Sequence, residues 1–159
     1  MDAVDRAAIA ALVYAYAERL DAGDLDGVAA LFEHATWGSS ARDGQLRGAA
    51  QVRRAYDGVI LHEDGTPSTK HVITNLVIEG DSVAGTASAR SYFTVLQARP
   101  GLALRPIIAG RYHDRFERAG DEAAWGFAER VILTDLVGDL THHLRDPGSA
   151  VPASEAAGS

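Results

Sequence analysis

Two side chains that could share a proton stand out in the chain: Asp21 in "RLDAGDLDG" and His71 in "TKHVITN". The first stretch is typical of a helix that ends in a tight turn, and the second opens a predicted strand. A carboxylate in the last turn of a helix meets the negative end of the helix dipole, which costs about 0.3–1 kcal/mol. A histidine that becomes cationic would offset this cost. We therefore expect Asp21 to hold one ring nitrogen of His71 and to leave the other free to remove a proton from a substrate.

Both residues also have simpler interpretations, which the sequence leaves open. Asp21 could be part of a polar turn, and His71 could be a strand-end histidine whose ring bonds a backbone carbonyl. Other chemistries have weaker signals. No GxSxG motif indicates a serine nucleophile, and no glycine-rich motif with a basic anchor indicates a phosphate site. The leading hypothesis is a general base, His71, oriented by Asp21.

The other histidines and the lack of cysteine argue against a metal site. His34 and His62 lie in loop-like stretches, where a solvated side chain is the simplest interpretation. His142 and His143 are adjacent, but no third ligand follows at a recognisable spacing, and there is no HExxH motif. Without cysteine, thiolate ligands, disulfides and cysteine nucleophiles are excluded. We expect no metal and no other cofactor.

The composition favours a soluble globular protein with a small-molecule or protein partner. The chain has 159 residues, of which 47% are hydrophobic, and its formal net charge is −7. This charge disfavours binding to nucleic acid or to anionic membranes. The N-terminal stretch predicts neither a signal peptide nor a membrane span, so cytoplasm is the expected location. We expect one domain over residues 1–144 and a flexible tail over residues 145–159.

The N-terminal third is predicted to be mainly helical. Helices are expected over residues 3–22, directly after Asp24, and over residues 49–61. Residues 33–48 predict two short strands with a loop between them. The apolar stripe of the first helix has Asp21 at its border, so this carboxylate can face the edge of a core.

From Lys70 onward the pattern is that of β-strands. Long strands near residues 83–97 and 102–118 indicate a strongly bent sheet, with Gly85 and Gly110 as candidate bulges. Helices followed by long antiparallel strands define an α+β fold. We expect a cone-shaped barrel, in which a strongly curved, mostly antiparallel sheet wraps around three N-terminal helices. The open end of such a cone is a natural pocket.

Four stretches of the chain have a pattern found in a known family: "AIAALVYAYAERLDAGDLDGVAALFEHATW", "RGAAQVRRAY", "TKHVITN" and "GRYHDRFERAGDEAAWGFAERVI". Together they resemble the SnoaL-like branch of the nuclear-transport-factor-2-like superfamily over about residues 5–140. The resemblance implies a cone-shaped α+β barrel with a deep pocket, commonly in dimers or trimers. In scytalone dehydratase and hexachlorocyclohexane dehydrochlorinase, an aspartate after the first helix and a histidine that opens a strand form the proton-abstracting base. Asp21 and His71 stand at the matching positions.

The resemblance also implies a role for Arg130 and shows where this chain differs. Arg130 stands where the dehydrochlorinase pattern has an arginine that helps the leaving group. Tyr16 stands where that pattern has a lysine, which argues against dechlorination. Leu20 stands where the scytalone dehydratase pattern has a tyrosine. The base matches while its surroundings differ, so the chain is not expected to be scytalone dehydratase itself.

These residues predict an enzyme that needs no cofactor and acts on a small hydrophobic molecule with a carbonyl or hydroxyl group. Dehydration, double-bond isomerisation and cyclisation all remain open, with Arg130 or Tyr16 as the group that stabilises a developing oxyanion or leaving group. The alternative is a non-catalytic binding or assembly module with the same pocket. The side chains expected to bind the small molecule are Tyr16, Trp37, Tyr56, Asn75, Tyr92 and Tyr112.

Two further expectations concern another reaction and the assembly. An epoxide hydrolase with an Asp–Arg–Asp relay would draw on the charged residues of the last strands, which are Arg111, Asp114, Arg130 and Asp135. Apolar residues occupy both phases of the long strands, so both faces of the sheet are expected to bury surface. This predicts a homodimer or a homotrimer.

Overall fold

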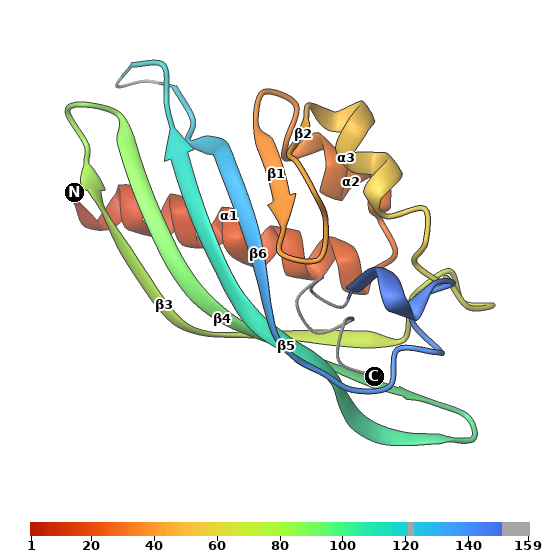
Figure 1. The fold of residues 1–159 in the computed structure, drawn as a ribbon. Helices are drawn as coiled ribbons and strands as arrows, with labels where there is room; N and C mark the ends of the chain where they lie inside the picture. The colour runs from red at the N-terminus through yellow and green to blue at the C-terminus, as the bar shows by residue number, and fades with distance from the viewer. Residues whose placement is uncertain (121–122, 151–159) are drawn as a thin grey trace.

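The computed structural model describes residues 1–120 and 123–150. Within these ranges helices come first and long strands follow, as expected (Figure 1). The helices are α1 (Ala3–Asp21), α2 (Leu25–Ala30) and α3 (Ala49–Ala55), and a 3₁₀ turn covers Pro147–Ala150. The strands are β1 (Thr36–Ser39), β2 (Leu46–Arg47), β3 (Thr69–Asp81), β4 (Thr86–Arg99), β5 (Leu102–Glu117) and β6 (Gly126–Val137).

The strands form one curved sheet in the order β2-β1-β6-β5-β4-β3. Neighbouring strands are antiparallel except β1 and β6, which pair in parallel. The sheet bends around α1, while α2 and α3 lie near β1 and β2 (Figure 1). The predicted α+β class and the mostly antiparallel curved sheet are confirmed. Because the described strands do not close into a ring, the sheet is an open cone with β2 and β3 at its edges.

Helix α1 is anchored at both ends. Asp2 caps its start by accepting a hydrogen bond from the backbone N–H of Asp5 at 2.8 Å. At its end, Gly23 has a φ of 74°, and a β-carbon there would lie 2.1 Å from the carbonyl oxygen of Gly65. Only glycine combines this left-handed backbone with such a close approach. The last turn of α1, with Asp21, is thereby held against the loop that leads into β3.

Alternation along the strands separates an inner face from an outer face. On β4, Ser91 and Phe93 are buried, whereas the intervening Tyr92 is exposed. Across the ladder, Ser91 pairs with Tyr112 and Tyr92 pairs with Arg111. Cross-strand partners share a face, so Tyr112 is inside and Arg111 outside. This parity decides which side chains can reach a cavity inside the cone.

The two glycines expected at bulges have different roles. The register of β5 and β6 shifts between Ala109 and Gly110, which confirms a bulge at Gly110. A β-carbon at Gly110 would lie 2.1 Å from the carbonyl oxygen of Leu133 and 2.9 Å from the ring of Phe93. The expectation for Gly85 was wrong, because this residue lies in the turn before β4 with a φ of 65°. A turn that needs a positive φ uses glycine for its backbone rather than for a bulge.

The segment before β3 and the segment after β6 also differ from expectation. Helix α3 stops at Ala55, short of the predicted range 49–61, and the chain there forms a bridge between Val59 and Leu144. Residues 145–150 of the expected tail pack back on this loop, since the N–H of Arg145 donates to the carbonyl of Gly58 at 2.9 Å. The rest of that tail, residues 151–159, lies outside the described residues. In the part of the chain that the structure describes, no helix has the length and apolarity that crossing a membrane requires.

Gly110→Ala tests the close packing at the bulge. The added methyl group has to displace either the backbone of β6 or the Phe93 ring, so we expect the free energy of unfolding to fall by roughly 1–3 kcal/mol. Gly126→Ala is the matched control, because nothing lies within 4 Å of its ideal β-carbon. The control should change stability by about 0.5 kcal/mol or less. Equal losses for both variants in denaturant titrations would contradict this packing.

Candidate active site

The carboxylate of Asp21 binds the start of β3 at three points. Its Oδ1 lies 2.6 Å from Nδ1 of His71 and accepts a hydrogen bond from the Thr69 hydroxyl at 2.9 Å. Its Oδ2 accepts from the backbone N–H of His71, also at 2.9 Å. The side chains of Asp21 and His71 are only 8% and 7% exposed. The carboxylate of Asp21 is therefore stable at the C-terminal end of its helix. Three hydrogen-bond donors replace the water that burial removes, and they offset the helix dipole.

This geometry decides which ring nitrogen of His71 is available. Burial alone would raise the pKa of Asp21, but hydrogen bonds from the ring and backbone of His71 and from Thr69 outweigh it and lower the pKa. An ionised carboxylate only accepts hydrogen bonds, so Nδ1 of His71 carries the proton. Nε2 is then the free lone pair, and no residue in the described ranges hydrogen-bonds it.

His71 lies on the wall of a cavity of about 180 Å³ inside the cone. The expected side chains Tyr16, Trp37, Tyr56 and Tyr112 also line it. Aliphatic side chains from the sheet and from the C-terminal segment complete a mostly apolar wall. A cavity of roughly 150 Å³ holds a benzene ring, so this one suits a molecule with a single ring and small substituents.

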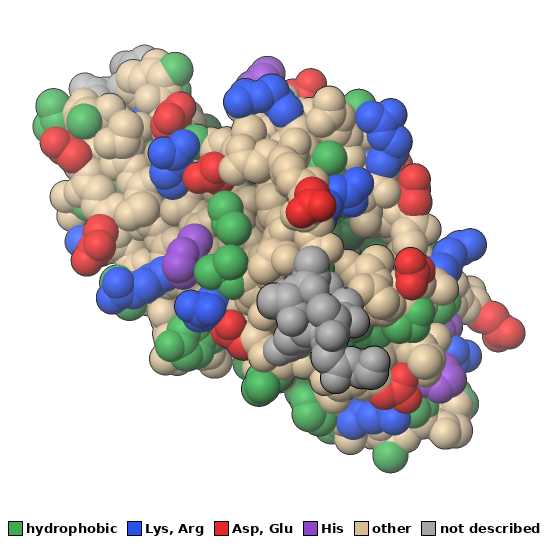
Figure 2. Space-filling view, viewed as in Figure 1, with side chains coloured by type: hydrophobic (Ala, Val, Ile, Leu, Met, Phe, Trp, Pro, Cys, Tyr) green, Lys and Arg blue, Asp and Glu red, His purple; other side chains and the backbone are tan. Residues whose placement is uncertain are grey.

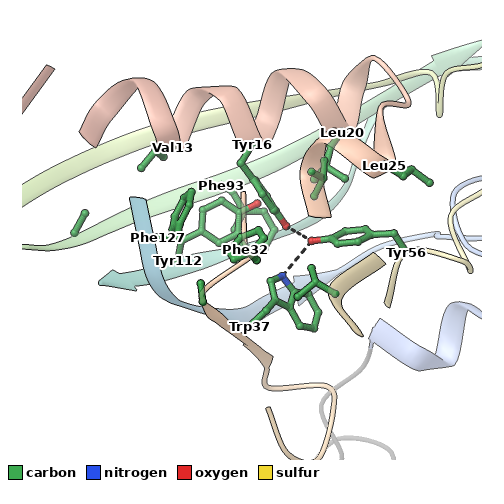
Figure 3. Close-up of a cluster of buried hydrophobic side chains, with 14 of the residues drawn as sticks. Val13, Tyr16, Leu20, Leu25, Phe32, Trp37, Tyr56, Phe93, Tyr112 and Phe127 are labelled. Atoms are coloured by element: carbon green, nitrogen blue, oxygen red, sulfur yellow. Dashed lines mark hydrogen bonds between the residues drawn. The ribbon is translucent and has the colours of Figure 1, made fainter. Parts of the chain in front are cut away.

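Two tyrosines and a tryptophan form a hydrogen-bonded chain on this wall (Figure 3). The hydroxyls of Tyr16 and Tyr56 are 2.7 Å apart, and Nε1 of Trp37 donates to the Tyr56 hydroxyl at 3.1 Å. Burial raises the pKa of both tyrosines, so both hydroxyls keep their protons at neutral pH. Their mutual bond uses one of the two protons. The pair therefore offers one O–H donor to a molecule in the cavity.

Arg130 is not on the cavity wall, contrary to the expected direct contact with a leaving group. It is fully buried, and its Nε and one terminal nitrogen donate to both oxygens of Asp114 at 2.8 and 2.7 Å. The two residues are direct partners on β5 and β6. The guanidinium carbon lies 4.1 and 4.2 Å from the ring centroids of Tyr16 and Tyr112. Arg130 thus supports the aromatic wall from behind by cation–π contact.

Two residues expected in the cavity lie elsewhere. Tyr92 is 51% exposed on the outer face, because its neighbour Phe93 takes the inward position on β4. Asn75 is exposed at a bulge of β3 between Thr74 and Val77, with a φ of 54°. The bulge breaks the alternation on which the expectation depended.

The relay expected for an epoxide hydrolase is not assembled either. Arg111 and Asp135 form a bidentate pair at 2.8 Å on the outer face of the sheet. Asp114 and Arg130 pair in the core on the inner face. Because the sheet separates the two pairs, they cannot act on one molecule.

Two polar residues of the site, one behind Asp21 and one on the cavity wall, were missed in the sequence. Thr69 holds Asp21, and it lies two residues before His71, so the period of a strand could have placed both on one face. His143 lines the cavity from the segment after β6, where no periodic pattern exists to predict its position.

No cluster of three or more His, Cys, Asp or Glu side chains in the described part of the chain could hold a metal ion. On the face shown in Figure 2, basic and acidic side chains are interspersed.

A curved, mostly antiparallel sheet around N-terminal helices, with a histidine–aspartate pair at an internal cavity, defines an α+β protein with an internal pocket. A model of the SnoaL-like domain matches residues 1–131, so the chain belongs to this family. Among curated proteins, the beta subunit of biphenyl 2,3-dioxygenase from Rhodococcus jostii (strain RHA1) is 32% identical over 94 residues. This match covers 59% of the chain but 50% of the relative, so the chain spans about half of that protein.

Solved structures share the fold at low sequence identity. An NTF2-like protein with a cystatin-like fold from Novosphingobium aromaticivorans has a TM-score of 0.66 and 19% identity, over 82% of this chain and 81% of that one. A candidate scytalone dehydratase from the same species has a TM-score of 0.65 and 22% identity, over 86% and 87% of the two chains. These likenesses confirm the cone-shaped fold that the sequence pattern predicted.

The half-buried His143 gives the free energy of unfolding a specific pH dependence. Burial lowers its pKa from 6.5 to about 4, helped by His71 and His62 and opposed by Asp21. The unfolded chain therefore takes up a proton at higher pH than the folded chain does, and acidification through this window favours unfolding. Relative to His143→Gln, we expect the wild-type free energy of unfolding to fall by up to about 3 kcal/mol as pH drops from about 6.5 to 4. Parallel pH profiles in denaturant titrations would contradict this.

Proposed function

We propose that this protein is a general-base enzyme that removes a proton from a carbon beside a carbonyl group, or from a hydroxyl, in a small and mostly apolar molecule. The observation that carries the proposal is the free Nε2 of His71 on the cavity wall, with Nδ1 held by Asp21 at 2.6 Å. This is the arrangement in which an imidazole accepts a proton and the cation that forms is stabilised. Asp21 orients the ring, and Thr69 orients Asp21.

The tyrosine pair supplies the second element of the site. When Nε2 takes the proton, the C–H electron pair forms a carbon–carbon double bond and the carbonyl electrons move onto oxygen. The free O–H of the Tyr16–Tyr56 pair is then the donor that stabilises the enolate oxygen. Of the two donors that the sequence offered for this role, Tyr16 and Arg130, only Tyr16 lies on the cavity wall.

The fate of the enolate decides the class of reaction. Return of the proton from His71 to another carbon of the conjugated system moves the double bond. Loss of a hydroxyl group with that proton releases water, and attack of the enolate carbon on a carbonyl within the same molecule closes a ring. A candidate scytalone dehydratase among the structures with this fold supports the elimination class. Each outcome uses the same proton and the same base.

Deuterium uptake tests the base. In D₂O, exchange of the acidic hydrogens of one-ring ketones such as acetophenone and cyclohex-2-enone, followed by NMR, should fall by about 10²–10⁴-fold in His71→Ala. Asp21→Asn should lose less, and the double variant should be no worse than His71→Ala, because the two residues act as a unit. His142→Ala is the matched control, since His142 is exposed and does not line the cavity. Exchange that persists undiminished in His71→Ala would rule out the base.

A second candidate function is an assembly subunit without turnover, and the match to a dioxygenase beta subunit favours it. In that case the bond between Asp21 and His71 has a structural role. Wild-type protein should then bind the ketones without exchanging their hydrogens. Asp21→Asn lowers the melting temperature under either function, because Asp21 holds the start of β3. Exchange by the wild-type protein therefore separates the two functions.

We further propose that the outer face of the sheet packs against a second copy, as a homodimer or a homotrimer. Val72, on β3, and Leu136, on β6, lie in one cross-strand row, because Val72 pairs with Thr94, Thr94 with Ala109, and Ala109 with Leu136. Tyr92 lies on the same face in the neighbouring row. These three apolar side chains are 41%, 70% and 51% exposed. An apolar patch of this kind on a sheet face is typical of an interface.

Light scattering at micromolar concentration tests the assembly. Wild-type protein should have the mass of a dimer or trimer, and Leu136→Glu should shift it toward monomer, because a carboxylate in an apolar interface is costly to desolvate. Val83→Glu is the control, since Val83 is 91% exposed in the β3–β4 turn. A monomeric wild-type protein would refute the interface.

A further inference from the structure

The backbone of His143 is held beside the cavity by two hydrogen bonds. Its carbonyl accepts a hydrogen bond from the N–H of Ile60, and its N–H donates to the carbonyl of Leu140, both at 2.9 Å. The next residue, Leu144, bridges to Val59. The ring therefore reaches the cavity from a fixed segment after β6, and it shares the wall with His71, which comes from β3.

Nδ1 of His143 is buried and has no hydrogen-bond partner in the described part of the chain. Buried polar atoms in proteins are rarely without a partner. Because this nitrogen has almost no accessible surface, a molecule in the cavity bonds it only after a small rotation of the ring. A hydroxyl both donates and accepts, so it can bond this nitrogen in either tautomer of the ring. A methyl group of the same size can do neither.

The two cavity histidines differ in their surroundings. The ring of His71 is bonded to a carboxylate that stabilises a cation, whereas that of His143 has no carboxylate partner. Burial and the nearby His71 lower the pKa of His143 to about 4, so its ring is neutral at neutral pH. His71 is thus suited to take a proton, and His143 is suited to bind a neutral polar group.

We propose that His143 is a binding residue that selects hydroxyl-bearing single-ring molecules by a hydrogen bond to its buried Nδ1. The cavity volume of about 180 Å³ limits the molecule to one ring with small substituents. The inference deepens the proposed function and rests on it for the cavity as the substrate site. It adds that the substrate carries a hydroxyl group besides the position from which His71 removes a proton.

Binding of two probes of nearly the same shape, 4-fluorophenol and 4-fluorotoluene, tests this selection by ¹⁹F NMR titration. His143→Leu should weaken binding of 4-fluorophenol by about 5–10-fold, the loss expected for one hydrogen bond, and change binding of 4-fluorotoluene by less than about 2-fold. His143→Gln, which keeps a hydrogen-bonding group, should retain part of the preference and guards against a folding defect in the leucine variant. His142→Leu should behave as wild type.

The outcomes separate this inference from the proposed function. Loss of the phenol preference in His143→Leu but not in His71→Ala supports the assignment. Loss in His71→Ala alone means that the hydroxyl bonds the base, and it overturns the assignment. An unchanged preference in every variant, or no binding of either probe to wild-type protein, also overturns it. Deuterium exchange measured on the same variants reports on the base independently, because it follows a proton at carbon and not the affinity for a hydroxyl.

Discussion

The carboxylate of Asp21 connects the two parts of the fold that have to meet for a site to exist. Asp21 is the last residue of α1. Its carboxylate binds the Thr69 hydroxyl and the backbone and ring of His71, and so it fixes the first residues of β3. The position of α1 is in turn set by its apolar stripe, with Ile9 and Val13 fully buried against the sheet. The orientation of the candidate base is therefore a consequence of core packing. A single polar contact at an exposed position would not fix the orientation of a histidine ring as well, because water would compete for the hydrogen bond.

The aromatic wall depends on a second constraint, the buried charge of Arg130. Asp114 accepts hydrogen bonds from Nε and one terminal nitrogen of the guanidinium, and the rings of Tyr16, Tyr112 and Phe127 cover its faces. A buried ion pair of this kind adds little net stability, but removal of one partner leaves an uncompensated charge in the core. The pair thereby specifies which rings lie next to it. The hydroxyl of Tyr16 lies 2.7 Å from that of Tyr56, and both tyrosines line the cavity.

The strand alternation keeps two tasks on opposite faces of one sheet. Phe93 and Tyr112 stack inside at 4.5 Å between centroids, a fit that depends on the missing side chain of Gly110. The residues next to them in the chain, Tyr92 and Arg111, lie outside. An interior site for a small molecule and an exterior surface for another copy can therefore coexist in one chain. The two proposed functions, an enzyme and an assembly subunit, differ only in what the inner face has to do.

The sequence by itself determined the local features: the helix stripe, the order of helices and strands, and the family pattern, through which Asp21 and His71 were matched to a known pair. These depend on periodicity and on short motifs, which are readable along the chain. Only the tertiary structure decided where Arg130, Tyr92 and Asn75 point, because strand register and a bulge set the face of each side chain. It also brought His143 to the cavity from a segment without periodic pattern. Such placements follow from contacts between distant parts of the chain, and no local spacing encodes them.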